Sequence, residues 1–196
     1  MFISWYYILF FIINIILTEK VKINIRKLNL VQRLELKVIG GKKVKIINSD
    51  YAKNIANIYI NGKSSSIDSS GNIQNLELEE NNVIIEWSIK FEKYTKLFKN
   101  IDTVIEIDFT NFDNTGISLI SNMFINCANL KYIKFNNFNT LSVYDMTSMF
   151  EDCPSLESLD LSSFDTSNVL YMENMFKNCK SLISLTLSNF YTPKIM

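Results

Sequence analysis

A repeat with a period of 26 residues is the feature that most limits how this chain can fold. The recurring residues are Met-Phe pairs at 123–124, 149–150 and 175–176, the cysteines Cys127, Cys153 and Cys179, and the phenylalanines Phe112, Phe138, Phe164 and Phe190. A single unit of this length cannot bury its own apolar side chains, so consecutive units must stack. We predict four units, over residues 97–122, 123–148, 149–174 and, incomplete, 175–196.

Each unit is expected to consist of a strand, a turn and a short helix. The third unit has the pattern L-x-x-L-x-L at residues 156–161, where alternation turns Leu159 and Leu161 inward. Apolar residues from Val169 to Cys179 then step by three, three and four, which places them on one face of a helix. The predicted fold class is therefore α+β, a β-α solenoid whose strands form a parallel sheet.

The outward positions of these strands are the candidate binding site. Stacked units would align them as a polar ladder on a concave face, a surface that solenoids commonly use for binding. They are Glu106, Asp108, Thr110, Tyr132, Lys134, Asn136, Ser158, Asp160, Ser162, Ser184, Thr186 and Ser188. Tyr132 is the one large side chain available as an anchor. The alternative is that these polar groups only solvate a sheet face.

Residues 19–96 are expected to form a β-rich domain that caps the repeats. Apolar residues alternate with charged ones in residues 33–38, and Asn61-Gly62 is a strong hairpin signal. Residues 83–91 place apolar side chains at a strict period of two, which predicts a strand with one buried face. Trp87 in this stripe is a candidate for ligand stacking, although an aromatic residue there more often belongs to the core.

Residues 1–18 are almost wholly apolar, and no charge occurs before Glu19. The apolar run fits a secretory signal peptide cleaved near Thr18 better than a full membrane span. It lacks a basic start and an Ala-x-Ala site, so an uncleaved membrane anchor and an amphiphilic core segment remain alternatives. A signal peptide or an anchor would place the rest of the chain outside the cytosol.

Composition excludes several classes of function. The chain has no histidine, so it cannot build a Ser-His-Asp triad, a Cys-His pair or a zinc site with imidazole ligands. The formal net charge is zero, which gives no basic footprint for a nucleic acid. The neutral total combines 14 basic and 9 acidic residues in 19–96 with 6 basic and 11 acidic in 97–196. This split favours contact between the two segments or association between chains.

The remaining candidate chemistry has a structural explanation in each case. The three cysteines recur with the repeat, which favours buried thiols, although two of them could pair if adjacent units lie close enough. The recurring methionines are expected in the core and not around copper. Glu106, Asp108, Asp160 and Asp165 are weak candidates for calcium or for a glycosidase pair. We therefore predict no catalytic residues, no metal and no cofactor.

The third unit carries a resemblance to a known family. Its residues Met149, Phe150, Cys153, Leu156, Leu159, Leu161, Phe164, Asp165, Thr166, Ser167, Val169 and Met172 match the pattern MF-x-x-C-x-x-L-x-x-L-x-L-x-x-F-D-T-S-x-V-x-x-M. Residues 97–196 thus resemble the BspA-like leucine-rich repeat proteins. The resemblance implies a secreted or surface protein that works by binding, with adhesion as the usual proposal, and it carries no catalytic residues. The first unit departs from the pattern, with Ile101 at the cysteine position, as a capping unit would.

The expected function is that of a non-enzymatic, secreted or cell-surface interaction protein whose partner is a protein or a surface glycan. The alternative is a membrane-tethered or intracellular leucine-rich repeat scaffold, in which membrane contact comes only from residues 1–18. The last strand, residues 182–188, would be an open sheet edge, and such edges invite self-association. The alternative is that the incomplete last unit belongs to a fragment of a longer repeat array.

Overall fold

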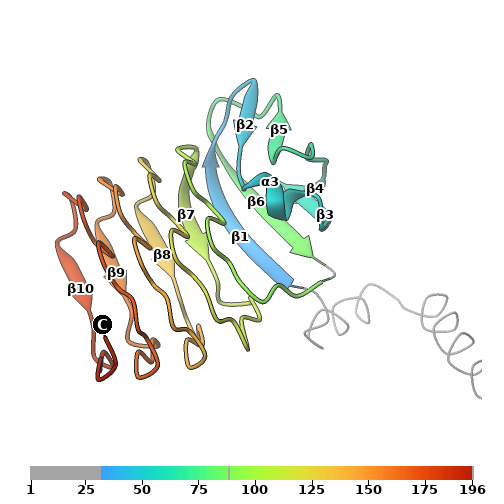
Figure 1. The fold of residues 1–196 in the computed structure, drawn as a ribbon. Helices are drawn as coiled ribbons and strands as arrows, with labels where there is room; N and C mark the ends of the chain where they lie inside the picture. The colour runs from blue at the N-terminus through green and yellow to red at the C-terminus, as the bar shows by residue number, and fades with distance from the viewer. Residues whose placement is uncertain (1–31, 88, 196) are drawn as a thin grey trace, which may run out of the picture. The chain divides into compact units, whose positions relative to one another are not determined.

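The structure is a computed structural model that describes residues 32–87 and 89–195, and it is rich in β-strands (Figure 1). Residues Gln32–Met196 form one compact unit. Its elements are β1 (Gln32–Ile39), β2 (Lys43–Lys45), α3 (Ser49–Ala52), β3 (Ile55–Ile60), β4 (Lys63–Ser64), β5 (Asn72–Gln74), β6 (Glu80–Trp87), β7 (Val104–Asp108), β8 (Tyr132–Lys134), β9 (Ser158–Asp160) and β10 (Ser184–Thr186). The predicted leader, residues 1–18, lies outside the described residues.

The largest sheet of the described chain is mixed and has the strand order β4-β3-β6-β1-β7-β8. Strand β1 pairs antiparallel with β6 on one side and with β7 on the other, whereas β7 and β8 are parallel. The expected boundary between residues 96 and 97 does not separate two compact units, because β1 and β7 lie on opposite sides of it in one sheet.

Two predictions for the first half are confirmed, the second of them in part. Residues Asn61 and Gly62 have φ angles of 50° and 81° and join β3 to β4, as a type I′ hairpin turn requires. The period-two stripe has its buried face only as far as Trp87, where β6 ends, because Val83, Ile85 and Trp87 are buried whereas Ile89 is 43% exposed. Trp87 belongs to the core, and its indole Nε1 donates a hydrogen bond of 3.2 Å to the Tyr51 carbonyl.

The 26-residue units lie one beside the next and are joined by backbone hydrogen bonds on three sides. Strands β9 and β10 pair in parallel, with Leu159 opposite Leu185. A second contact line runs through single parallel bridges from Leu119 to Asp145 and from Asp145 to Tyr171. The third runs through the Met-Phe turns, where for example the Phe124 amide donates to the Met149 carbonyl at 2.9 Å.

The prediction of an α+β or β-α solenoid is wrong, because the part of the chain that the structure describes has a single helix, the four-residue α3, which lies before the repeats. The molecule is a small β-rich fold with a mixed sheet. The segment from Val169 to Cys179, expected to be helical, has a single bridge at Tyr171 and turns over residues 173–178. Asn174 and Asn178 explain why, since their φ angles of 58° and 61° are left-handed and cannot continue a right-handed helix.

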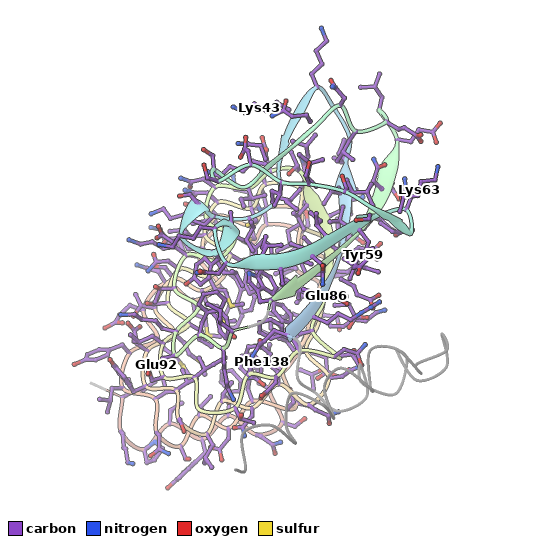
Figure 2. All side chains as sticks on the ribbon, turned by 90° about the vertical axis from the view of Figure 1, so that its right-hand side faces the viewer. Lys43, Tyr59, Lys63, Glu86, Glu92 and Phe138 are labelled. Carbon is purple, nitrogen blue, oxygen red and sulfur yellow. The ribbon has the colours of Figure 1, made fainter. Side chains whose placement is uncertain are left out.

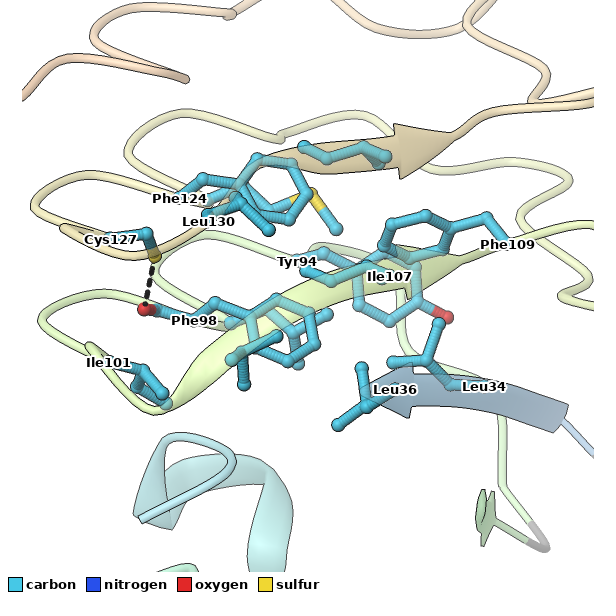
Figure 3. Close-up of a cluster of buried hydrophobic side chains, with 14 of the residues drawn as sticks. Leu34, Leu36, Tyr94, Phe98, Ile101, Ile107, Phe109, Phe124, Cys127 and Leu130 are labelled. Carbon is cyan, nitrogen blue, oxygen red and sulfur yellow. Dashed lines mark hydrogen bonds between the residues drawn. The ribbon is translucent and has the colours of Figure 1, made fainter. Parts of the chain in front are cut away.

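Phenylalanine ladders fill the interior of the stacked units. Phe124 stacks on Phe98 and on Phe150 with ring centroids 5.7 and 5.4 Å apart and interplanar angles of 7° and 5°. A second ladder pairs Phe109 with Phe135 at 5.4 Å. Figure 3 shows this core continuing past the repeats to Leu34 and Leu36 of β1, so the antiparallel strands and the repeats share one core.

Candidate binding face

The predicted outward residues lie on the solvent side of the repeat strands. We call this side the polar strand face. It consists of the outward side chains of β1, β7, β8, β9 and β10 together with Thr110, Asn136, Ser162 and Ser188. Strand register aligns them in two rows. On β1, β7 and β8, one row contains Glu35, Asp108 and Lys134, and the other contains Lys37, Glu106 and Tyr132. Strands β9 and β10 form a separate two-stranded sheet, in which Asp160 pairs with Thr186 and Ser158 with Ser184. The Glu157 amide donates to the Lys131 carbonyl at 3.2 Å, which holds β9 beside β8.

Alternation places the predicted residues as expected on the solvent side. Glu106, Asp108, Ser158 and Ser162 are half-buried, and the others are exposed. The exposed residues are Thr110, Tyr132, Lys134, Asn136, Asp160, Ser184, Thr186 and Ser188. The intervening residues of β7, β8 and β9, such as Ile107, Ile133 and Leu159, are buried. All twelve predicted side chains are therefore at least partly accessible to solvent.

Two members of the face, Glu35 and Lys37 of β1, were missed by the sequence reasoning. They join it because β1 pairs with β7, which sets Glu35 opposite Asp108 and Lys37 opposite Glu106. Their alternation with buried leucines was visible in the sequence, but nothing there indicated that β1 would lie against the first repeat strand.

Ion pairs cross from strand to strand on this face. Lys37 Nζ lies 2.8 Å from Glu106 Oε1 and 3.6 Å from a carboxylate oxygen of Glu80. The hydrogen bond to Glu106 raises the pKa of Lys37 above its usual value, so the ammonium stays charged. Lys134 Nζ lies 3.3 Å from Asp108 Oδ2, which links β8 to β7 in the same way.

The aspartates of the face are held as carboxylates by local hydrogen bonds. Partial burial alone would raise the pKa of Asp108, but hydrogen bonds from Thr110 and Lys134 outweigh it and lower that pKa. The Ser162 amide donates to Asp160 Oδ1 at 2.9 Å and lowers the pKa of Asp160. Both groups therefore present negative charge at neutral pH.

Tyr132 is the large side chain at the centre of the face. Its hydroxyl donates a hydrogen bond of 2.5 Å to Glu157 Oε2 in the next unit, and this bond raises the pKa of the phenol. The side chain remains 40% exposed. Tyr132 is thus an aromatic surface fixed in position by its polar end, which is suited to pack against a ligand with little loss of entropy.

Three shallow depressions lie along the polar strand face. A depression of about 250 Å³ is bordered by Lys37, Glu106 and Tyr132. The next, of about 450 Å³, has Tyr132 and Lys134 on one side and the small residues of β9 and β10 on the other. The third, of about 580 Å³, lies over Thr110, Asn136 and Ser162. The face can thus receive an extended ligand through hydrogen bonds and one aromatic contact.

The other candidate residues of the sequence were the acidic side chains and the cysteines. Across residues 32–87 and 89–195, there is no group of three or more cysteine, aspartate or glutamate side chains that could hold a metal ion. Asp165 is held by the Ser167 amide at 2.9 Å and is not one of the residues that border the three depressions. Cys127, Cys153 and Cys179 are free thiols, and their positions are internal or half-buried.

Figure 2 shows the molecule from the side of the antiparallel strands, with Tyr59 on β3 and Glu86 on β6. Glu86 is buried, accepts a hydrogen bond of 3.2 Å from Asn57 Nδ2, and lies 3.6 Å from a guanidinium nitrogen of Arg33. This carboxylate is therefore a structural partner of two neighbouring strands.

Comparison with known proteins gives one match. The family model described as "Mycoplasma protein of unknown function, DUF285" matches residues 92–196, the segment that contains all four repeat units. No curated protein and no solved structure matches the chain. Among the residues that the structure describes, no helix is long and apolar enough to span a membrane. Since the matched segment covers more than half of the 196 residues, the chain belongs to the DUF285 family.

Proposed function

We propose that this protein is a non-enzymatic interaction protein of the cell surface or the extracellular space, which binds a protein or a glycan through the polar strand face. The observation that carries the proposal is the alignment of charged and aromatic side chains in two rows across β1, β7 and β8, with the polar pairs of β9 and β10 beside them. The resemblance of the repeats to BspA-like proteins and the apolar leader support the same function.

The chemistry of the face supports binding by hydrogen bonds and electrostatic contacts. Lys37 and Lys134 are each paired with a carboxylate. In the second depression, β9 and β10 contribute the hydroxyl groups of their serines and threonine together with the carboxylate of Asp160. Two kinds of ligand offer hydrogen-bond donors for such a surface: glycans, and proteins that present a polar strand. Tyr132 would supply the anchoring contact.

The test is a cell-binding measurement with the labelled full-length chain and a matched pair of tyrosine variants. Tyr132 and Tyr144 are each 40% exposed, but only Tyr132 lies on the polar strand face. We expect Tyr132→Ala to reduce bound protein at least tenfold, because removal of a central anchor costs about 2 kcal/mol or more. Tyr144→Ala should bind like the unaltered chain.

The nature of the partner follows from treating the target cells before binding. Loss after protease treatment indicates a protein partner, and loss after periodate oxidation indicates a glycan. Binding that is equal for both tyrosine variants, or absent from every cell surface tried, contradicts the proposal. N-terminal sequencing of the mature chain tests the location, since secretion predicts a start near Glu19 and tethering predicts an intact Met1.

A further inference from the structure

The row of repeat strands is interrupted between β8 and β9. Between β9 and β10 the Leu161 amide donates to the Thr186 carbonyl at 3.0 Å, and β7 and β8 are paired in the same parallel way. The equivalent bond one unit earlier, from the Phe135 amide to the Asp160 carbonyl, is not formed in the described chain, and β8 and β9 belong to different sheets. Asn137, close after β8, has a left-handed φ of 60°, unlike its equivalents in the other units. The row therefore opens inside the array, with repeat units on both sides.

Two of the depressions on the polar strand face lie over this opening. The depression of about 450 Å³ and the one of about 580 Å³ are both bordered by Lys134 of β8 and by Asp160 of β9. The smaller of the two also has Tyr132 on its border, and the larger one continues past Asn136 and Ser162. An extended ligand can therefore pass from one depression into the other.

Tyr132 offers an aromatic ring for stacking. It borders the depression of about 250 Å³ as well as the one of about 450 Å³, so the ring lies between two hollows. Its hydroxyl is bonded to Glu157, which fixes the ring while the side chain stays 40% exposed. The face of an aromatic ring is weakly negative, and the C–H bonds on one side of a sugar ring are weakly positive. A sugar can thus stack on this tyrosine.

Asp160 carries the one unpaired charge on the border of the 450 Å³ depression. The other two charged residues there, Glu106 and Lys134, each lie in an ion pair. Among the described residues, Asp160 makes no ion pair, and its carboxylate accepts from Ser162. A carboxylate has acceptor capacity for two or more donors, and its hydrogen bonds are stronger than those of a neutral group. It therefore attracts hydroxyl groups and repels an anionic ligand.

The remaining border of this depression suits a glycan better than a protein. Ser158, Ser184 and Thr186 contribute hydroxyl groups, which both donate and accept hydrogen bonds, as the hydroxyl groups of a sugar do. The centre of a protein–protein interface is depleted of charge and enriched in aromatic residues and methionine. Three charged residues and one aromatic residue border this depression, which is the opposite balance.

We propose that the 450 Å³ depression binds a neutral hexose unit of a glycan, whose ring stacks on Tyr132 and whose neighbouring hydroxyl groups bind the Asp160 carboxylate. This inference rests on the proposed function and narrows its partner to a neutral glycan. Asp160 lies one repeat and two residues after Tyr132, an offset of about 6.6 Å along the strands, which a hexose with its hydroxyl groups can span. The next sugar of the chain lies in the 580 Å³ depression.

The test is equilibrium binding of the labelled full-length chain to a panel of immobilised neutral hexose oligosaccharides and to the sulfated forms of the same oligosaccharides. We expect binding to a neutral oligosaccharide that is weakened by about tenfold or more when the sugar is sulfated, because Asp160 repels the anion. Tyr132→Ala and Asp160→Asn should each lower the affinity for the neutral form by about tenfold or more.

The matched control is Asp165→Asn. Asp165 accepts a hydrogen bond of 2.9 Å from the Ser167 amide, as Asp160 does from the Ser162 amide, but it does not border the depression. Its replacement should change the affinity by no more than about twofold.

Binding to none of the neutral oligosaccharides, tighter binding of the sulfated forms, or equal affinities of the Asp160→Asn and Asp165→Asn variants would each overturn the hexose site. Binding to cells separates this result from the proposed function. Cell binding that depends on Tyr132 but is lost after protease treatment, and not after periodate oxidation, would keep the proposed function and reject the glycan.

Discussion

The thiol of Cys153 donates a hydrogen bond of 3.1 Å to the carbonyl oxygen of Phe124 in the preceding repeat unit. Cys127 makes the equivalent bond to Phe98, drawn in Figure 3, and Cys179 makes it to Phe150. The recurring cysteine therefore does more than fill space. It ties each unit to the equivalent phenylalanine of the unit before it, at a site where a buried carbonyl oxygen needs a donor.

Replacement of Cys153 by alanine should destabilise the protein by about 1–2 kcal/mol, through the lost hydrogen bond and the small cavity that remains. Cys179→Ala should cost less, because that side chain is only half-buried. Urea unfolding followed by tryptophan fluorescence measures both values. Equal losses for the two variants would show that burial of the thiol does not set the cost.

The phenylalanine ladder predicts a second graded pair. Phe150 is fully buried and stacks on Phe124 and Phe176, so Phe150→Ala should cost about 3–5 kcal/mol. Phe176 has a stacking partner on one side in the described chain, and its truncation should cost clearly less. Thermal unfolding measures the loss of stability in both variants. A larger loss for Phe176→Ala than for Phe150→Ala would mean that the last unit is the more tightly packed.

The position of each repeat strand could be predicted from the sequence, but the structure between the strands could not. Apolar alternation at residues such as Leu159 and Leu161 is a local property, and it correctly separated the buried side from the polar strand face. The intervals of three and four between the apolar residues from Val169 to Cys179 wrongly indicated a helix. Consecutive turns that point their apolar side chains into one core produce the same intervals.

The feature that distinguishes these turns is a second, weaker pattern. Pairs of left-handed residues at a spacing of four occur where each unit begins, as in Asn122 and Asn126 or Asn174 and Asn178. Asparagine tolerates this conformation better than most residues, so its recurrence at that spacing was a signal for turns. The pairing of β1 with β7 had no such local signal, because long-range contacts between strands depend on the whole fold.

Asn126 allows the cost of the left-handed turn to be measured. Its φ is 61°, and its Nδ2 donates to Asn100 Oδ1 at 2.8 Å. Asn126→Gly loses only the side-chain bond, whereas Asn126→Ala also forces a Cβ into an unfavourable region. Alanine should therefore be less stable than glycine by about 1 kcal/mol in chemical unfolding. The opposite order would mean that the entropy of glycine in the unfolded chain dominates.

The polar strand face should contribute to stability in a pH-dependent way through Asp108. Its folded pKa is lowered, so it lies below the unfolded value of about 3.9. The stabilisation is fully present above that value and is lost as the pH falls through the folded pKa. Melting temperatures at pH 6 and pH 3 should therefore differ less for Asp108→Asn than for the unaltered chain. The same difference in both proteins would contradict this role.

Thiol reactivity should report separately on the last unit and on the interior. Burial raises the pKa of Cys179 to about 11 and raises the pKa of Cys127 well above its usual value, so at pH 8 few thiolates are present at either position. Cys179 is half-buried, whereas Cys127 and Cys153 are fully enclosed between units. A thiol-specific reagent with a chromophore should therefore modify one cysteine slowly in the native protein and all three in urea. Mass spectrometry of the native product should locate that label on Cys179.

The thiols of Cys127 and Cys153 become accessible only when adjacent units separate. Their modification rate should therefore rise in the variant Phe150→Ala. A rate that this variant leaves unchanged would show that access does not require the phenylalanine ladder to open.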